Sequence, residues 1–291
     1  MKTYIIGASS DLGVSINGTK LGPKKIINGI KKKYDNCIII KQDDKICKSV
    51  DSKDLRKNEN EINKYNTKIY NKTLENIKNG YFPILIGGDH SISIASALAS
   101  QKANENIGII WFDAHTDFNT FETTETGNIH GLPLAAICGY KNKELRKFFD
   151  EKPIDPKNIV VVGARSIDKQ ELVNVKDAGI TVFTTEDIKS KGIKYIVDEA
   201  FKIASNNTNK VHVSYDLDLI DPKDAPGVTV PEINGITKSE ALELNNEILN
   251  HINEIVSCDL VELNPDNDID LKTENFAIKM INQMINKVNE K

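Results

Sequence analysis

The stretch IIWFDAHTDFN, from Ile109 to Asn119, decides the fold expected for this chain. It begins with four apolar residues, as a β-strand buried inside a sheet does. Asp113, His115 and Asp117 then follow at alternate positions. Alternate side chains of an extended chain point the same way, so we expect these three to face one side where the strand ends. Burying such groups is costly unless an opposite charge compensates them, which suggests a cation.

Seven other apolar runs look like strands of the same kind. Most of the runs are continuous rather than alternating in polarity, which is typical of parallel strands covered on both faces. The eight predicted strands are Thr3–Gly7, Cys37–Ile40, Pro83–Ile86, Ile107–Phe112, Asn158–Val162, Ile180–Phe183, Val211–Tyr215 and Ile255–Val261. Helical patterns lie between many of them, at Asn60–Lys78, Ser91–Ala103, Lys169–Ala178, Gly192–Ser205, Thr237–Asn250 and Lys272–Val288. This alternation predicts an α/β fold of three layers around a mainly parallel eight-stranded sheet.

Composition narrows the class of protein. The chain has 291 residues, of which 39% are hydrophobic and 27% charged, with a formal net charge of -4. No repeat or linker divides it, so we expect one catalytic domain over residues 1–291. No basic patch suited to nucleic acid stands out, and no apolar run approaches the ~20 residues of a membrane helix. The N-terminus does not resemble a signal peptide and the four cysteines form no close pairs, which favours the cytoplasm.

Polar motifs follow four of the predicted strands. They are GGDHS after Pro83–Ile86, DAHTD after Ile107–Phe112, DLDLIDP after Val211–Tyr215 and ELNP after Ile255–Val261. Ligands of open α/β sheets collect beyond the carboxyl ends of the strands, so we expect these motifs to share one site. Longer loops are expected at Thr116–His130, Leu219–Gly235 and around Asp43–Asn58.

The motifs together contain the donors of a two-metal site. Asp216 and Asp218 alternate on their strand as Asp113, His115 and Asp117 do, and His90 adds a second imidazole. Each residue alone has a simpler explanation, such as a loop histidine, a turn or a helix cap. Four carboxylates and two imidazoles suit two divalent ions that share bridging carboxylates. Oxygen and nitrogen donors without sulfur favour Mn²⁺, with Mg²⁺, Fe²⁺, Co²⁺, Ni²⁺ and Zn²⁺ as alternatives. Such a pair lowers the pKa of a shared water, which predicts metal-assisted hydrolysis.

The motif set resembles the ureohydrolase family, which comprises arginases, agmatinases and formiminoglutamases. The resemblance covers nearly the whole chain and rests on GGDHS, DAHTDFN, GNIHGLP, SYDLDLIDP and ELNP, with DLGVSINGTKLGP at Asp11–Pro23 like the family's opening loop. Arginase is the most similar member. That resemblance implies a binuclear manganese enzyme, a trimer or hexamer, that uses a metal-bridging hydroxide to convert L-arginine to L-ornithine and urea. It assigns one metal to His90, Asp113, Asp117 and Asp216, and the other to Asp113, His115, Asp216 and Asp218.

The resemblance also assigns the substrate contacts. Asn119, Thr126 and Asn128 match the loop that holds the α-amino and α-carboxylate groups, although such residues also make ordinary turns. His130 matches a proton-transferring histidine, and Asp117 a group that stabilises the tetrahedral intermediate. Glu262 matches the carboxylate that faces the guanidinium. Asp168 matches a contact to the α-amino group, assisted by Glu171, but these two residues equally predict a helix capping box.

One loop departs from the arginase pattern. In APGVTVPEING, at Ala225–Gly235, Val230 stands where arginases usually have the threonine that orients the guanidinium-facing glutamate. Valine cannot donate that hydrogen bond, so Thr229 is the candidate replacement. The loop also resembles that of formiminoglutamases. A formiminoglutamase or another guanidino-acid ureohydrolase therefore stays open as the alternative, and a catalytically silent metal-binding protein is the third reading.

Overall fold

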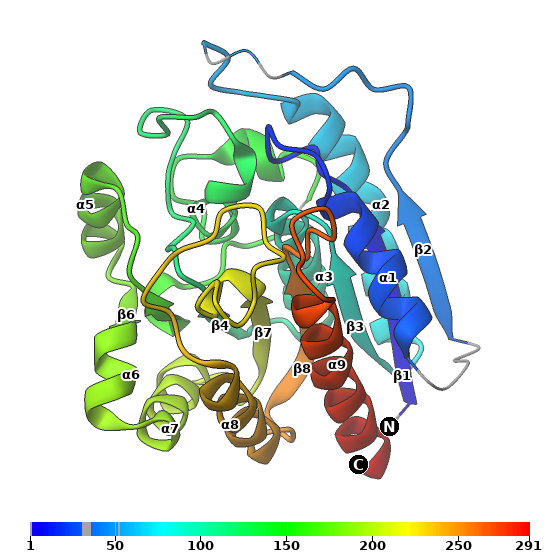
Figure 1. The fold of residues 1–291 in the computed structure, drawn as a ribbon. Coiled ribbons are helices and arrows are strands. Elements are labelled where there is room, and N and C mark those ends of the chain that lie inside the picture. Colours follow the sequence, from blue (N-terminus) through cyan, green and yellow to red (C-terminus); the bar gives the residue numbers. More distant parts are fainter. Residues whose placement is uncertain (1, 31–35, 50, 52, 150) are drawn as a thin grey trace.

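One eight-stranded parallel sheet forms the middle of the molecule (Figure 1). The computed structural model describes residues 2–30, 36–49, 51, 53–149 and 151–291. Strand order across the sheet is β2-β1-β3-β8-β7-β4-β5-β6, and every neighbouring pair is parallel. The strands are β1 (Lys2–Ser9), β2 (Cys37–Lys41), β3 (Tyr81–Gly87), β4 (Gly108–Phe112), β5 (Ile159–Ala164), β6 (Thr181–Thr184), β7 (Val211–Asp216) and β8 (Ile255–Val261).

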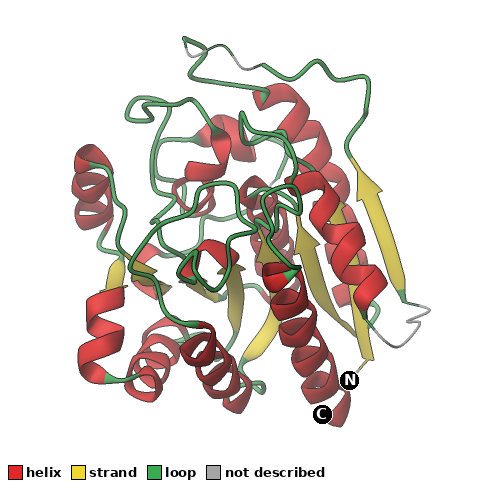
Figure 2. Cartoon of the chain, in the orientation of Figure 1, coloured by secondary structure: helices red, strands yellow, loops and turns green. Residues whose placement is uncertain are grey.

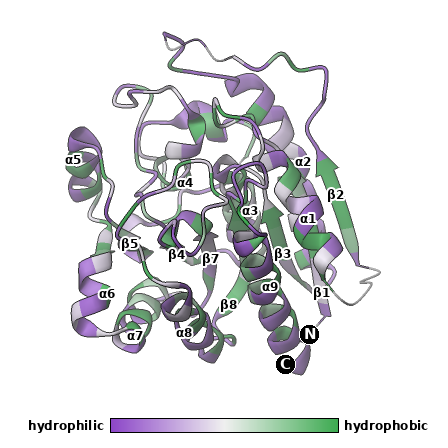
Figure 3. Ribbon diagram, viewed as in Figure 1, coloured by the Kyte–Doolittle hydropathy of each residue, from purple (hydrophilic) through white to green (hydrophobic). Residues whose placement is uncertain are grey.

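Helices cover both faces of the sheet and create two hydrophobic cores (Figure 2). One face packs against α1 (Gly22–Gly29), α6 (Thr185–Lys191), α7 (Ile193–Ala204), α8 (Lys238–Asn250) and α9 (Lys272–Glu290). The other packs against α2 (Glu59–Lys78), α3 (Ser93–Asn104), α4 (Pro133–Ile137) and α5 (Lys169–Ala178). Side chains of one strand alternate between the cores, so that Ile110 and Phe112 enter one while Ile109 and Trp111 enter the other. The strands are accordingly rich in hydrophobic residues, as β2 and β3 show in Figure 3.

The predicted fold class is confirmed, with an all-parallel rather than a mainly parallel sheet. Each predicted strand exists, and its ends lie within two residues of the expected positions. Three helices were not predicted: α1, α4 and α6. They are short, at 5 to 8 residues, and helices of that length owe their stability to packing rather than to local sequence. The predicted helix Ser91–Ala103 is interrupted, because His90–Ile92 forms a 3₁₀ turn before α3 begins at Ser93.

The four strands that carry polar motifs are neighbours, in the order β3-β8-β7-β4. Their carboxyl ends therefore bring the four motifs to one stretch of the sheet edge. Of the expected loops, the connection around Asp43–Asn58 contains positions 50 and 52, which lie outside the described residues. No helix in the described part of the chain is both long and apolar enough to cross a membrane.

Candidate functional site

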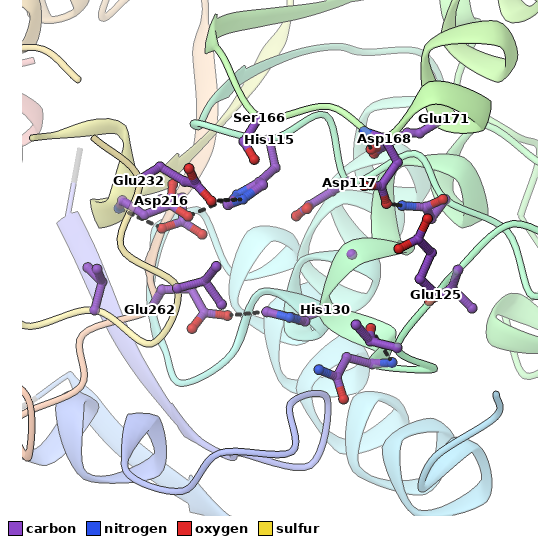
Figure 4. A pocket seen from close by; sticks show the side chains of 18 residues that line it. His115, Asp117, Glu125, His130, Ser166, Asp168, Glu171, Asp216, Glu232 and Glu262 are labelled. Carbon is purple, nitrogen blue, oxygen red and sulfur yellow. Dashed lines mark hydrogen bonds and ion pairs between the residues drawn. The ribbon is translucent and has the colours of Figure 1, made fainter. Parts of the chain in front are cut away.

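A cavity of about 280 Å³ opens above these strand ends (Figure 4). Eight of the residues around it are acidic and two are histidines, whereas lysine and arginine are absent from its described lining. The lining comprises His115, Asp117, Asn119, Thr124, Glu125, Thr126, Asn128, His130, Gly131, Ser166, Asp168, Glu171, Asp216, Asp218, Val228, Val230, Glu232 and Glu262. A cavity of this charge favours a cationic occupant, either metal or substrate.

His90 lies among three carboxylates, two of which, those of Asp117 and Asp216, line the cavity. Its Nδ1 atom is 3.1 Å from the Oδ2 atoms of Asp113, Asp117 and Asp216. One ring nitrogen cannot satisfy three acceptors, and no hydrogen bond of acceptable geometry to Nδ1 is present among the described residues. All four side chains are buried. The arrangement fits a metal ion that accepts the nitrogen lone pair and the three carboxylate oxygens together.

Buried partners behind His90 select the tautomer that such a metal requires. Its Nε2 atom lies 2.8 Å from the hydroxyl of Ser214, which itself donates to Asp259. Because the serine hydrogen goes to the carboxylate, Nε2 of His90 carries the proton and donates to Ser214. Nδ1 is then left as a bare lone pair. His212 Nε2 lies 3.0 Å from Asp259 Oδ2 and Ser96 donates to the same oxygen at 2.6 Å, so this carboxylate is held from behind. Support of this kind orients metal-bound histidines in many proteins.

His115 forms a second group beside the first. Its Nδ1 atom lies 3.0 Å from Asp218 Oδ2 and 3.4 Å from Asp113 Oδ1. Ligand atoms of His90, Asp113 and Asp216 lie within 4.8 Å of one another, and so do those of Asp113, His115 and Asp218. Asp113 belongs to both groups, as a bridging carboxylate would. The structure thus brings together all six predicted ligands, with Asp117 joining through its contact to His90.

The six residues converge for a different reason from the one expected. The strand ends at Phe112, as the sequence predicted, so Asp113, His115 and Asp117 reach one site without the alternation of an extended strand. The Asp113 carboxylate instead accepts the backbone N–H of His115 at 2.6 Å, which turns the chain. Asp117 then adopts a positive φ of 47°, which redirects its side chain toward His90. Loop geometry, not strand alternation, therefore places these groups.

Electrostatics also point to a missing positive charge. Burial, together with the neighbouring Asp113, raises the pKa of Asp117 to about 7. Burial and Asp218 raise the pKa of Asp216. Burial opposes a charge on His90, but the surrounding carboxylates outweigh it and raise the His90 pKa well above its usual value. Without a cation these groups must take up protons, and bound divalent ions would remove that need.

Glu262 and His130 form the next wall of the cavity (Figure 4). Glu262 follows β8 with a positive φ of 68°. Its Oε1 atom accepts the His90 backbone N–H at 2.8 Å and lies 3.1 Å from His130 Nδ1. Its Oε2 atom is buried and has no hydrogen-bond partner among the described residues. Burial lowers the pKa of His130, but the adjacent Glu262 carboxylate raises it by more, so the pKa of His130 lies above its usual value.

Asp168 and Glu171, two of the predicted contacts to the amino acid, lie across the cavity from Glu262, on the right of Figure 4. Asn119 donates to Asp168 Oδ2 at 3.0 Å, and both line the cavity. Asp168 begins α5 with the capping box that the sequence also predicted. Glu171 accepts the backbone N–H of Phe118 at 2.8 Å and that of Asp168 at 3.2 Å. Glu171 therefore has a structural task at this wall, whatever it does for a ligand.

The loop that departs from the arginase pattern lines the cavity through Val228, Val230 and Glu232. Thr229, the candidate replacement for the missing threonine, is not among the lining residues and accepts a hydrogen bond from Asn264 at 3.3 Å. This placement does not support direct contact between Thr229 and a substrate. The structure instead adds Glu232, whose Oε1 is 3.6 Å from His115 Nε2. An acidic residue so close in sequence to Val230 was the signal that could have revealed it.

Arg165 was also missed, because its partners are backbone atoms. The guanidinium donates to the carbonyls of Asp218 at 2.7 Å, Glu232 at 2.8 Å and Ile233 at 3.0 Å. It thereby joins the end of β5 to the metal-ligand loop and to the loop that contains Glu232. Backbone contacts of this kind leave no pattern in a single sequence.

Known proteins resemble this chain along its whole length. A family model described as "Arginase family" matches residues 1–286. The arginase of Bacillus subtilis (strain 168) is 35% identical over 289 residues, covering 97% of each chain. The solved structure of Bacillus caldovelox arginase has a TM-score of 0.89 and 31% identity, covering 98% of each chain. Entamoeba histolytica arginase, solved in complex with L-ornithine, has a TM-score of 0.88 and 30% identity over 98% of this chain and 99% of that one.

Proposed function

Since this chain belongs to the arginase family, we propose that it hydrolyses the guanidinium group of L-arginine to give L-ornithine and urea. One observation carries the choice of substrate. The buried Oε2 atom of Glu262 lacks a partner at the cavity wall beside the candidate metal ligands. A planar guanidinium presents N–H donors and a positive charge, which is what such a carboxylate oxygen requires.

Two Mn²⁺ ions are the proposed cofactors, with Co²⁺, Ni²⁺ or Fe²⁺ as substitutes, because the donors are carboxylates and imidazoles. His90, Asp113, Asp117 and Asp216 would hold one ion, and Asp113, His115, Asp216 and Asp218 the other. When bound, such a pair supplies hydroxide from water near neutral pH.

The chain's own residues perform the remaining steps of the proposed reaction. Glu262 holds the guanidinium with its carbon toward the metal ligands, and Asp117 hydrogen-bonds the nucleophile and the tetrahedral intermediate. His130 delivers a proton to the leaving amine, a step suited to an imidazolium whose pKa is raised by the adjacent Glu262. The amino-acid end is held by four residues that line the same cavity: Asn119, Thr126, Asn128 and Asp168.

The alternative is a formiminoglutamase or another guanidino-acid ureohydrolase, favoured by Val230 at the cavity wall. Purified protein incubated with Mn²⁺ should release urea from L-arginine, and much less product from agmatine, guanidinobutyrate or formiminoglutamate. Asp117→Ala or His130→Ala should reduce kcat by at least about 100-fold. Turnover confined to formiminoglutamate would establish a formiminoglutamase. A metal-loaded protein that turns over none of these substrates would favour a catalytically silent metal-binding protein.

We propose a homotrimer or homohexamer on the family resemblance, which light scattering of the purified protein tests. A cytoplasmic location is supported by the four cysteines, none of which forms a disulfide.

A further inference from the structure

The amino-acid end of the cavity lacks a visible source of positive charge. Eight acidic side chains line the cavity, and no lysine or arginine occurs in its described lining. A substrate carboxylate entering this space would be repelled unless a cation lay nearby. Of the candidate metal ligands labelled in Figure 4, His115 and Asp216 lie on the side of Glu262. Asp117 lies between His115 and Asp168. The charge that favours a carboxylate must therefore come from behind the lining residues.

Lys57 is such a charge. Its side chain is buried, with 5% of the residue exposed. The ammonium donates to the carbonyl oxygen of Thr126 and, at 3.2 Å, to the hydroxyl oxygen of Ser15. No ion pair between Lys57 and a carboxylate occurs among the described residues, and its ammonium donates to neutral oxygen atoms. A buried charge without a counter-ion is costly, and its field acts on the adjacent cavity with little screening.

The hydrogen bonds of Lys57 determine how Asn128 is oriented. An ammonium only donates, so Ser15 Oγ accepts from Lys57 and must direct its own hydrogen elsewhere. That hydrogen goes to Asn128 Oδ1, at 2.7 Å. The amide oxygen of Asn128 is thus occupied on the side of Ser15. Asn128 lines the cavity, and its amide NH₂ group is not used in the contact with Ser15. An NH₂ group can donate hydrogen bonds to a carboxylate.

The segment that carries Lys57 is clamped against the same loop. It belongs to the connection between β2 and α2, which passes over the carboxyl edge of the sheet (Figure 1). Gly127, with φ of +70°, lies so close that an added Cβ would meet the Asp54 carbonyl oxygen at 2.2 Å. Asn58 donates to the Leu12 carbonyl at 2.9 Å. The connection therefore braces the Thr126–Asn128 turn rather than merely covering it.

We propose that Lys57, acting through Ser15 and the Thr126 carbonyl, makes the cavity select guanidino compounds that bear a carboxylate. It does so by turning the Asn128 amide NH₂ toward that carboxylate and by supplying the positive charge behind it. This inference rests on the proposed function and deepens it, since it explains why L-arginine would be preferred to its decarboxylated form. Lys57 is a positioning residue, because it lines no part of the cavity itself.

The test compares ligands that differ only in the carboxylate. Binding of L-ornithine and of 1,4-diaminobutane to the Mn²⁺-loaded protein is measured by calorimetry, and urea release from L-arginine gives kcat and KM. Lys57→Met should raise the Kd of L-ornithine and the KM of L-arginine by about tenfold, as loss of a charge-assisted contact does. The Kd of 1,4-diaminobutane should stay constant, and kcat should change by less than about twofold. Ser15→Ala should weaken L-ornithine in the same selective way.

Lys48→Met is the matched control. Lys48 lies on the same connection, donates to the carbonyls of Asp11 at 3.0 Å and Ile16 at 3.2 Å, and pairs with the Asp11 carboxylate. Its loss therefore loosens the segment without removing a hydrogen bond of the Ser15 or Asn128 side chain. It should leave the ratio of the two dissociation constants unchanged.

Equal weakening of both ligands by Lys57→Met, or no weakening of either, overturns the inference, as does wild-type protein that binds both ligands equally well. If the Lys57→Met protein does not fold, the dissociation constants of Ser15→Ala for L-ornithine and 1,4-diaminobutane test the inference by themselves. Absence of urea release from wild-type protein that still prefers L-ornithine would overturn the proposed function only.

Discussion

At the scale of single residues, Glu262 connects the two halves of the site. One oxygen of its carboxylate accepts from the His90 backbone and contacts His130, while the other is buried without a partner. A positive φ of 68° aims the side chain there, a conformation uncommon for a non-glycine residue. Glu262 thus supplies a guanidinium-binding oxygen and at the same time raises the pKa of the proposed proton donor.

Replacing Glu262 with glutamine should separate these effects. Glu262→Gln removes the charge that raises the His130 pKa, so the imidazolium should lose its proton at a lower pH. In the pH profile of kcat/KM, the fall in activity at high pH should therefore begin at a lower pH. The value of kcat/KM for L-arginine should itself decrease by roughly 100-fold. An NMR titration of the His130 ring measures the shift directly. Glu122→Gln, at an exposed pair with Lys141, is the control, and an unmoved His130 titration would contradict the assignment.

At the scale of elements, the end of β5 determines where two functional loops lie. Arg165 follows β5 and donates to the carbonyls of Asp218 and Glu232. An added Cβ at Gly235 would meet the Arg165 guanidinium at 2.8 Å, so this turn is packed against it. The position of a metal ligand is therefore coupled to Arg165, which lies 53 residues away from Asp218 in the sequence.

Loss of the Arg165 guanidinium should destabilise both loops together. Arg165→Met leaves several carbonyls, most of them at partly buried contacts, without donors, so we expect the free energy of unfolding to fall by about 2 kcal/mol or more. The Mn²⁺ dissociation constant should rise as well, because Asp218 is no longer held. Chemical denaturation and metal titration measure the two effects. Arg56→Met, which removes surface ion pairs to Glu59 and Glu144 and a cation–π contact with Phe121, should cost about 1 kcal/mol, and equal losses for both variants would refute the role of Arg165.

At the scale of the whole molecule, the site lies where four neighbouring strands end between two large cores. The sheet order places β3, β8, β7 and β4 side by side, so their motifs meet although they are up to about 170 residues apart, as His90 and Glu262 are. Buried carboxylates gathered in this way repel one another and oppose folding. Metal binding should therefore stabilise the entire domain.

Removal of metal should lower the melting temperature of the whole protein. A ligand present at 100 times its Kd stabilises the native state by about 2.7 kcal/mol, which corresponds to several degrees for a chain of this size. We expect a chelator to lower Tm by at least about 5 °C, measured by calorimetry, and Mn²⁺ to restore it. Ca²⁺ should restore it poorly, because imidazole donors do not suit that ion. A Tm that changes neither with chelator nor with added Mn²⁺ would argue against a buried metal centre.

The sequence by itself determined the eight strands, the parallel sheet and the six candidate metal ligands. These features depend on short-range patterns: continuous apolar runs form buried strands, and carboxylates and histidines beside such runs require a partner. Only the tertiary structure decided that Arg165 clamps two loops, that Glu232 faces His115, that Thr229 turns toward Asn264, and that Lys57 supports Asn128 through Ser15. The Ser15–Asn128 hydrogen bond joins residues 113 positions apart. Contacts of this kind arise from which segments the fold brings together, and no local pattern in either segment encodes them.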